Sequence, residues 1–315
     1  MVEQPSVSVK VPRAVLVDTF GQNLEFSKEL APLSSFGTGG KAKYFISAMS
    51  ADGIISAIRG AKKLNIPCFV IGGGSNLLVS DEGYEGLIIK VNVLGMRLAS
   101  DMVIESGAGE DLMDLVHFAT ANSLTSLEFA AGIWGSVGGA VYGNAGAYGG
   151  EIGSVVSELT LLHRDGRTET VSREYCQFGY RDSCLKKTGD VIVSARFALK
   201  RGDKAAISAR VDEILRDREA KHPSHGNSAG CFFKNITDRS QPHGKLPAGK
   251  LLEEAGVKHL SVGGAHVYEK HANIIVNSGN ATSKDIRQLA DIMKRKVLDR
   301  FGVELEQEVI QIGKF

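Results

Sequence analysis

The sequence predicts an α+β fold with mixed sheets, built from more than one lobe. Stretches with strand character alternate with helical periodicity along the chain, and a hairpin pattern interrupts that alternation. At 315 residues, of which 43% are hydrophobic and 23% charged, the chain is long enough to bury two or three separate cores.

The first 200 residues hold most of the predicted strands. A helix is predicted over 51–64, because one helical face gathers Ile54, Ile55, Ile58 and Ala61. PCFVIGGGSNLLV follows as a buried strand that breaks into a glycine turn, and GLIIKV is another strand. DMVIES and EDLMDLVHFATA repeat the strand-to-helix order, and ELTLLHRDGRTETV predicts a hairpin that turns at Asp165 and Gly166.

Beyond residue 200 the pattern becomes more helical. A helix is predicted from about residue 204 to 220, and the His-Pro pair at 222–223 ends it. The final helix begins after Thr282, whose hydroxyl can cap it. Its inward face is predicted to carry Ile286, Leu289, Met293 and Val297.

The charge distribution argues against several classes of partner. A formal net charge of +1 gives no global field for a polyanion, so no nucleic-acid partner is expected. Residues 201–315 carry 19 Lys+Arg against 15 Asp+Glu, a balance that suits a small anionic ligand. No apolar run is long enough for a membrane span, and the N-terminal MVEQPSVSVK lacks the apolar core of a secretory signal. We therefore expect a cytoplasmic protein without a membrane partner.

The cysteines argue against metal and disulfide sites. Cys68, Cys176, Cys184 and Cys231 form neither a CxxC pair nor a Cys/His zinc spacing, so we expect no structural metal and no disulfide framework. Cys231 stands in SAGCFFKN, where four interpretations stay open: a small buried hydrophobe, a metal ligand, a nucleophile or a proton donor. The flanking phenylalanines favour a raised thiol pKa, whereas Lys234 favours a lowered one.

Two glycine-rich stretches are the strongest local signals. GGGSN spans 72–76, GIWGSVGGAVYGNAGAYGGE spans 132–151, and nine of the 22 residues from 132 to 153 are Gly. Each glycine costs about 0.5 to 1 kcal/mol relative to Ala inside a helix or strand, so these positions serve something other than stability. Backbone amides without Cβ atoms can wrap a pyrophosphate. A pair of purely structural turns is the alternative.

Two further motifs carry charged side chains. Arg181 of FGYRDS can grip a carboxylate through two parallel hydrogen bonds, or it can belong to an ordinary surface loop. GVELEQEVIQIG is predicted to return as a strand after the final helix, which places Glu306 and Glu308 on one face. A solvated face is the alternative interpretation of that pair.

Six motifs, taken in order, make the chain similar to one family: GGGSNLLV, GSVGGAVYGNAGAYG, YRDS, SAGCFFKN, EKHANIIVN and LEQEV. From about Leu33 to Gly313 the sequence resembles the UDP-N-acetylenolpyruvoylglucosamine reductases of peptidoglycan synthesis, the MurB family. The short connection between Tyr180 and DVIVSARFAL resembles the subtype that lacks an extra tyrosine-bearing substrate loop.

The resemblance implies a particular version of the α+β fold. Residues 1–200 would form an FAD-binding region of the PCMH or vanillyl-alcohol-oxidase type, with α+β subdomains at about 20–92 and 93–200. Residues 201–315 would form an α+β substrate-binding domain. The family uses noncovalent FAD, with NADPH as co-substrate.

Site residues are also implied by the resemblance. Both glycine clusters would hold FAD, through Gly72, Gly73, Gly74, Ser75, Asn76, Gly132, Ser136, Val137, Gly138, Gly139, Asn144 and Gly146. Arg181 would bind the enolpyruvyl carboxylate, Glu308 would work with it, and Cys231 would be the proton donor where the family more often has Ser. Weaker assignments to the UDP-sugar are Tyr180, Lys221, Lys234, Asn235 and His271.

The implied reaction is the reduction of UDP-N-acetylglucosamine enolpyruvate to UDP-N-acetylmuramate in cell-wall biogenesis, by a protein expected to be a monomer. Two alternatives stay open. An FAD-dependent sugar or alcohol oxidase of the same fold would leave SAGCFFKN and LEQEV unexplained. A catalytically inactive nucleotide-sugar-binding regulator would have no use for intact Arg181 and Glu308.

Overall fold

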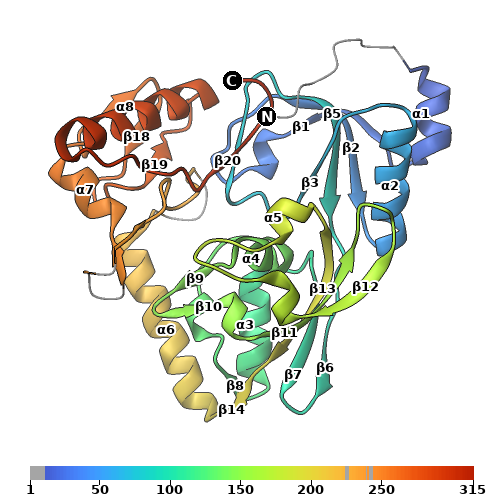
Figure 1. Ribbon diagram of the computed structural model, residues 1–315, viewed down its shortest axis with the longest axis horizontal. Coiled ribbons are helices and arrows are strands. Elements are labelled where there is room, and N and C mark those ends of the chain that lie inside the picture. Colours follow the sequence, from blue (N-terminus) through green and yellow to red (C-terminus); the bar gives the residue numbers. More distant parts are fainter. Residues whose placement is uncertain (1–10, 224–226, 239, 241–243) are drawn as a thin grey trace.

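The computed structural model describes residues 11–223, 227–238, 240 and 244–315, and it has the predicted α+β architecture (Figure 1). Three lobes contain a four-stranded mixed sheet, a five-stranded antiparallel sheet and a three-stranded sheet, respectively. The N-terminal segment MVEQPSVSVK, for which no secretory signal is expected, lies outside the described residues.

The first lobe is built on a sheet with the strand order β1-β2-β5-β3, in which β2, β5 and β3 run parallel. These strands are β1 (Glu25–Glu29), β2 (Lys41–Ala48), β3 (Cys68–Ile71) and β5 (Tyr84–Val91). The predicted helix α2 (Ala51–Lys63) begins where the Ser50 hydroxyl accepts a hydrogen bond from the Gly53 N–H at 3.1 Å. It packs on β2 and β5, and α1 (Arg13–Phe20) packs on α2.

The second lobe is an antiparallel sheet with the order β12-β11-β13-β7-β6. Its strands are β6 (Met96–Ser100), β7 (Val103–Gly107), β11 (Val156–Leu162), β12 (Thr168–Ser172) and β13 (Val191–Ala198). The β11–β12 hairpin confirms the predicted turn, where Gly166 has a φ of +87°. The sequence gives no signal for β6, because four of its five residues are exposed. Two helices lie beside this sheet: α3 (Leu112–Ala121) and α4 (Val137–Gly143).

The third lobe pairs two helices with a small sheet. Its elements are α7 (Ala248–Glu254), α8 (Ser283–Phe301), β17 (Ser261–Val262), β18 (Ala265–Val267) and β19 (Ile275–Asn277). Thr282 caps α8 as predicted, in a reciprocal capping box with Asp285. The four apolar residues predicted to face inward from this helix are all buried. The helix α6 (Lys204–Lys221) packs elsewhere, on α3, where Val211 and Ile214 join a core that the first and second lobes share.

The strand β20 (Ile310–Ile312) leaves the third lobe and returns to the first, where it pairs in parallel with β4 (Leu77–Val79). Along β4, Leu77 and Val79 pack with Ile312 in one core, while Leu78 packs into the core of the third lobe. The strand predicted over GVELEQEVIQIG is therefore shorter than expected. Before residue 310 the segment makes a single bridge, from Gln307 to Phe233, and no regular ladder.

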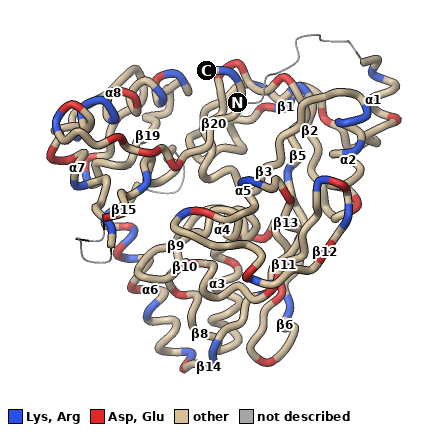
Figure 2. The backbone as a smooth tube through the Cα atoms, in the orientation of Figure 1, with Lys and Arg blue, Asp and Glu red and all other residues tan. Residues whose placement is uncertain are grey.

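The remaining elements are short. They are β8 (Leu124–Thr125), β9 (Gly146–Ala147), β10 (Gly150–Glu151), α5 (Leu185–Thr188), β14 (Lys200–Arg201), β15 (Ile236–Thr237), β16 (Lys245–Leu246) and four 3-10 turns at Ala31–Leu33, Glu128–Ala130, Ile152–Ser154 and Arg173–Cys176. Basic and acidic residues alternate along outer helices such as α8 (Figure 2). None of the helices in the described part of the chain has the length and apolar character needed to cross a membrane.

Candidate active site

The two glycine clusters interlock at one place between the first and second lobes. The Gly73 N–H donates to the Ser136 hydroxyl at 3.2 Å, and the Ser75 hydroxyl donates to the Trp134 carbonyl at 2.9 Å. A Cβ added to Gly73 would lie 2.7 Å from the Ser136 backbone nitrogen, and one on Gly135 would lie 2.4 Å from the Ser75 hydroxyl. Glycine is therefore required for the two clusters to touch.

A cavity of about 490 Å³ lies against these clusters. Of the predicted cofactor residues, Gly72, Gly73, Ser75 and Ser136 line it. The rest of the wall was not predicted from the sequence. It comes from residues 31–35, Gly37, Lys90, Val91, Asn92, Gly109, Asp111, Gly135 and Asn227. Lys90 is a half-buried cation at this wall. A lysine in a strand beside no glycine motif carries no sequence signal of its own.

Several other predicted cofactor residues shape the surrounding packing. Val137 is fully buried in the core of the second lobe. A Cβ on Gly138 would lie 2.9 Å from the Ala108 Cβ, and one on Gly146 would lie 2.6 Å from the Gly150 carbonyl oxygen. Two more glycines give room to neighbouring residues: Gly74, against the Leu33 carbonyl, and Gly132, against the Arg218 side chain. The Gly139 N–H donates to the Ser136 hydroxyl at the start of α4.

A two-residue turn presents Tyr180 and Arg181. The backbones of Gly179 and Asp182 exchange two hydrogen bonds, of 3.0 and 3.1 Å, which leaves Tyr180 and Arg181 at the tip. Arg181 has a φ of +52°, in the left-handed region that favours glycine. A non-glycine residue there costs roughly 1 to 2 kcal/mol, so the surrounding contacts must hold this turn in place.

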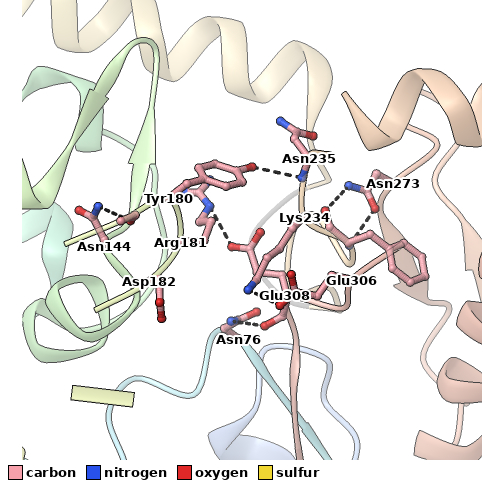
Figure 3. A network of polar contacts seen from close by, with 12 residues as sticks. Asn76, Asn144, Tyr180, Arg181, Asp182, Lys234, Asn235, Asn273, Glu306 and Glu308 are labelled. Atoms are coloured by element: carbon pink, nitrogen blue, oxygen red, sulfur yellow. Dashed lines mark hydrogen bonds and ion pairs between the residues drawn. The ribbon is translucent and has the colours of Figure 1, made fainter. Parts of the chain in front are cut away.

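Arg181 and Glu308 point toward one another (Figure 3). The Arg181 Nε lies 3.0 Å from Glu308 Oε1, yet its N–H has no aligned hydrogen-bond partner. Burial raises the pKa of Glu308, and the Arg181 charge opposes that rise. The Asn76 side chain donates to the Glu308 carbonyl at 3.1 Å, which joins this pair to the first glycine cluster.

Cys231 lies beside this pair as a half-buried thiol. Its neighbour Phe232 accepts a hydrogen bond from the Glu308 N–H at 2.8 Å, so the two catalytic candidates come from adjacent stretches of backbone. Burial raises the pKa of the Cys231 thiol to about 11, with a further rise from the Glu308 charge and opposition from the Arg181 and Arg218 charges. At Cys231 burial therefore outweighs the opposing effect of the nearby positive charges.

Arg218 on α6 is a cation near the site that the sequence analysis missed. Its side chain occupies the space that Gly132 leaves open, and burial lowers the pKa of its guanidinium. The charges of Cys231 and Arg181 both act on that pKa, which places Arg218 close to the catalytic candidates. In the sequence it stands among other charged residues of an amphipathic helix, and nothing distinguishes it there.

Two of the residues predicted to contact the substrate meet at the turn. The Tyr180 hydroxyl accepts a hydrogen bond from the Asn235 N–H at 3.2 Å (Figure 3), and Lys245 Nζ lies 3.4 Å from the centre of the Tyr180 ring. The Asn235 side-chain oxygen accepts from the Ala248 N–H at 3.1 Å, at the start of α7. Lys245 is a further residue that the sequence analysis did not select.

The other substrate candidates lie around this centre in separate pairs. Lys234 Nζ forms an ion pair with Glu306 at 2.5 Å, so the two glutamates of LEQEV have different partners. Lys221 is exposed and pairs with Asp217 at 2.6 Å. His271 stacks on His222 with ring centres 5.8 Å apart. No group of three or more His, Cys, Asp or Glu within the described residues is arranged to hold a metal ion.

The arrangement fits a bound dinucleotide next to an anionic substrate. The cavity has the size of a small-molecule site, glycine backbone forms one wall, and Lys90 offers a positive charge at that wall. Beyond Asn76 stand a guanidinium, a carboxylate and a protonated thiol. These groups can bind a carboxylate, stabilise developing negative charge and release a proton.

Comparisons with known proteins give consistent matches. Residues 222–312 match the family described as "UDP-N-acetylenolpyruvoylglucosamine reductase, C-terminal domain", and residues 42–172 match "FAD binding domain". The chain is 40% identical over 281 residues to the UDP-N-acetylenolpyruvoylglucosamine reductase of Clostridium novyi, across 89% of both chains. It is 37% identical to that of Streptococcus pneumoniae, across 93% of this chain and 95% of the other. The solved MurB of Thermus caldophilus aligns with a TM-score of 0.76 at 33% identity, covering 92% of this chain and 98% of that one.

Proposed function

Because this chain belongs to the UDP-N-acetylenolpyruvoylglucosamine reductase family, we propose that it uses NADPH, through bound FAD, to reduce UDP-N-acetylglucosamine enolpyruvate to UDP-N-acetylmuramate. The observation that carries this proposal is the joining of three features. Asn76, which ends the first glycine cluster beside the cavity, hydrogen-bonds to Glu308. Glu308 in turn pairs with Arg181 and lies near the Cys231 thiol.

FAD would be held at the interlocked glycine clusters. Of the twelve residues expected to contact it, the four that line the cavity are proposed as direct contacts: Gly72, Gly73, Ser75 and Ser136. Lys90, on the same wall, would offset phosphate charge. When bound, FAD supplies the chemistry of passing a hydride from NADPH to the vinyl group of the substrate.

Arg181 would bind the carboxylate of the enolpyruvyl group. Hydride addition at the terminal vinyl carbon leaves negative charge on the neighbouring carbon and its carboxylate. A guanidinium placed beforehand stabilises that charge, and one such donor is typically worth about 3 kcal/mol. The Arg181 Nε is buried beside Glu308, so a substrate carboxylate would meet the terminal nitrogens of the guanidinium.

Cys231 would supply the proton that completes the reduction. The carbon that carries the charge must take up one proton, and a thiol with a pKa of about 11 holds its proton at neutral pH. Transfer leaves a thiolate, which Arg181 and Arg218 stabilise because their charges lower the pKa of Cys231. Glu308 opposes them, and so keeps the thiol protonated between turnovers.

The proposal also covers the domain boundaries, the cellular location and the oligomeric state of the protein. Residues 1–200 would form the FAD-binding region, with subdomains at about 20–92 and 93–200, and residues 201–315 the substrate-binding region. The helix α6 connects them, since it follows residue 200 yet packs on the second lobe, and the match to the C-terminal family begins at residue 222. We further propose that the protein acts as a cytoplasmic monomer without nucleic-acid or membrane partners.

NADPH oxidation with and without the enolpyruvyl substrate tests the function. The purified protein is expected to carry flavin and to oxidise NADPH at a rate that rises strongly when the substrate is added, with one product formed per NADPH. If the protein consumes O2 and its rate does not change when the enolpyruvyl compound is added, it is an oxidase instead. Substrate binding without any NADPH oxidation would indicate an inactive binding protein.

A further inference from the structure

The short helix α4 physically joins the two halves of the site. At its start, the Ser136 hydroxyl accepts hydrogen bonds from Gly73 and Gly139, which fixes the helix to the glycine wall of the cavity. At its end stands Asn144, in a left-handed conformation with a φ of +46°. Asn is one of the few residues besides Gly that accept this backbone geometry at a helix C-terminus.

Asn144 uses both ends of its side-chain amide inside the protein. Its Nδ2 donates to the Gly179 carbonyl at 2.8 Å, the contact drawn beside Asn144 in Figure 3. Its Oδ1 accepts from the Gly153 N–H at 2.8 Å. The side chain is 1% exposed. Because a carbonyl faces one end and an N–H faces the other, the orientation of the amide is fixed by its partners. Both polar ends of the Asn144 side chain are therefore used in hydrogen bonds to the backbone.

A second hydrogen bond attaches the same turn to α4. The Ser183 hydroxyl donates to the Tyr142 carbonyl at 2.7 Å, and Ser183 is also buried. Gly179 begins the turn that presents Arg181, and Ser183 follows that turn directly. Both sides of the turn are therefore attached to the last residues of α4.

The placement of the Arg181 guanidinium depends on this turn. Its Nε–H has no aligned hydrogen bond, so the ion pair with Glu308 restrains its distance more than its direction. The left-handed backbone at Arg181 is unfavourable for a residue with a Cβ and persists where neighbouring contacts over-determine it. The contacts from Asn144 and Ser183 are of that kind.

We propose that Asn144 is a positioning residue for Arg181. Its hydrogen bonds hold the turn at 179–182 in the position from which the Arg181 guanidinium reaches the substrate carboxylate. This inference rests on the proposed function. It assigns Asn144 to the substrate half-reaction, and the earlier expectation that Asn144 contacts FAD is replaced by an indirect link through α4.

Asn144→Asp tests the assignment with a nearly isosteric change. The carboxylate still accepts from Gly153, but it turns an acceptor toward the Gly179 carbonyl and pushes the turn away. Purified variant should retain flavin and be reduced by NADPH at the parent rate. Reoxidation of the reduced flavin by the enolpyruvyl substrate should slow by about 10 to 100-fold, the scale of a small misplacement of a catalytic group. Asn144→Gly, which suits the left-handed backbone and deletes both contacts, should show the same split.

Asn122→Asp is the matched control, because Asn122 also ends a helix and donates its Nδ2 to a carbonyl, that of Phe118, at 2.8 Å. It should reoxidise like the parent. A cycle with Arg181→Lys separates positioning from general damage: if Asn144 acts through Arg181, the double variant is no slower than Arg181→Lys alone.

Three results would overturn the proposal: fully additive losses in that cycle, loss of flavin from both Asn144 variants, or parent-like reoxidation by both. Failure of the parent and of Asn122→Asp to reoxidise with the enolpyruvyl substrate would instead reject the proposed function itself.

Discussion

The Nε atom of Arg181 lies 3.0 Å from Oε1 of Glu308, but its N–H bond does not point at that oxygen. The two residues are paired by charge through this buried nitrogen. The directional capacity of the guanidinium toward a substrate carboxylate therefore lies in its terminal nitrogens.

The first prediction concerns that directional capacity. Arg181→Lys is expected to keep its flavin and its reduction by NADPH, and to lose about 10²- to 10³-fold in reoxidation by the enolpyruvyl substrate, because a compact ammonium cannot reproduce a planar fork. Rapid-mixing absorbance of the flavin measures both half-reactions. Arg196→Lys is the control, since Arg196 pairs with Glu105 and Glu158 on the second sheet. Equal losses in both half-reactions of Arg181→Lys would place Arg181 in cofactor binding or folding.

Cys231 is expected to matter in one half-reaction. Cys231→Ala should leave flavin reduction unchanged and slow reoxidation by about 10²-fold or more, the scale of general-acid catalysis. Cys231→Ser should recover much of that loss, because a hydroxyl occupies the same place and carries a proton. Cys68→Ala, at an exposed thiol, is the control. If Cys231→Ala turns over the substrate at nearly the parent rate, Cys231 has a packing role and is not the proton donor.

The pH dependence of Cys231 follows from its burial. The thiol pKa is raised to about 11, so the protonated form predominates below that pH. The rate of alkylation of Cys231 by iodoacetamide should therefore keep rising with pH up to that value, whereas the rate of an ordinary thiol levels off at about pH 8.5. The Glu308 charge contributes to that rise, so Glu308→Gln should shift the alkylation profile to lower pH. Peptide mass spectrometry across a pH series measures both profiles. A profile with a midpoint near neutrality in the parent would contradict a protonated resting thiol.

His222 should make stability depend on pH in the acid range. Burial, together with the Arg218 and His271 charges, lowers its pKa from 6.5 to about 4. Between these values the unfolded chain binds the proton more readily than the folded chain does, so stability is present above pH 6.5 and is lost as pH falls toward 4. Urea midpoints at pH 7.5 and 5 should differ less in His222→Phe than in the parent. His259→Gln, at an exposed histidine, should leave the difference unchanged.

The strand β20 should stabilise the first lobe and its cavity. Ile312 is 3% exposed and packs against Leu77 and Val79 of β4. Ile312→Ala is expected to lower the free energy of unfolding by about 2 to 5 kcal/mol and to weaken flavin retention, because β4 directly follows the first glycine cluster. Leu298→Ala removes a comparable side chain that is 39% exposed, and should change stability by less than about 0.5 kcal/mol. If Ile312→Ala is clearly destabilised but retains all of its flavin, β20 does not contribute to flavin binding at the cavity.

Local patterns predicted the elements that local physics determines. Helices α2, α6 and α8 follow from apolar periodicity, the cap of α8 follows from Thr282, and the β11–β12 hairpin follows from its turn residues. The caps formed by Ser50 and Asp203 became visible only in the structure. The strand β6 could not be predicted, because an exposed edge strand needs no alternation of apolar and polar residues. The shortened β20 reflects tertiary context, since the backbone before it bonds residues 232 and 234 and forms no sheet.

The candidate site was predictable only as separate motifs. The family resemblance implied that Arg181, Cys231 and Glu308 act together, whereas the residue patterns alone do not show that these distant segments meet. Lys90, Arg218 and Lys245 became visible once the fold placed them. Asn144 was selected for its glycine-rich surroundings, and its contacts with Gly179 and Gly153 explain why an amide is needed there.

The pairing of β20 with β4 also sets an order of assembly during synthesis. Asn76, next to β4, and its partner Glu308, next to β20, are 232 residues apart. At about 5 to 20 residues per second, a ribosome needs roughly 12 to 46 s to travel that distance. During this interval the nascent first lobe displays β4 with an open edge, which is a template for pairing with other chains. The hydrogen bond from Asn76 to Glu308 therefore forms only after nearly the whole polypeptide has been made.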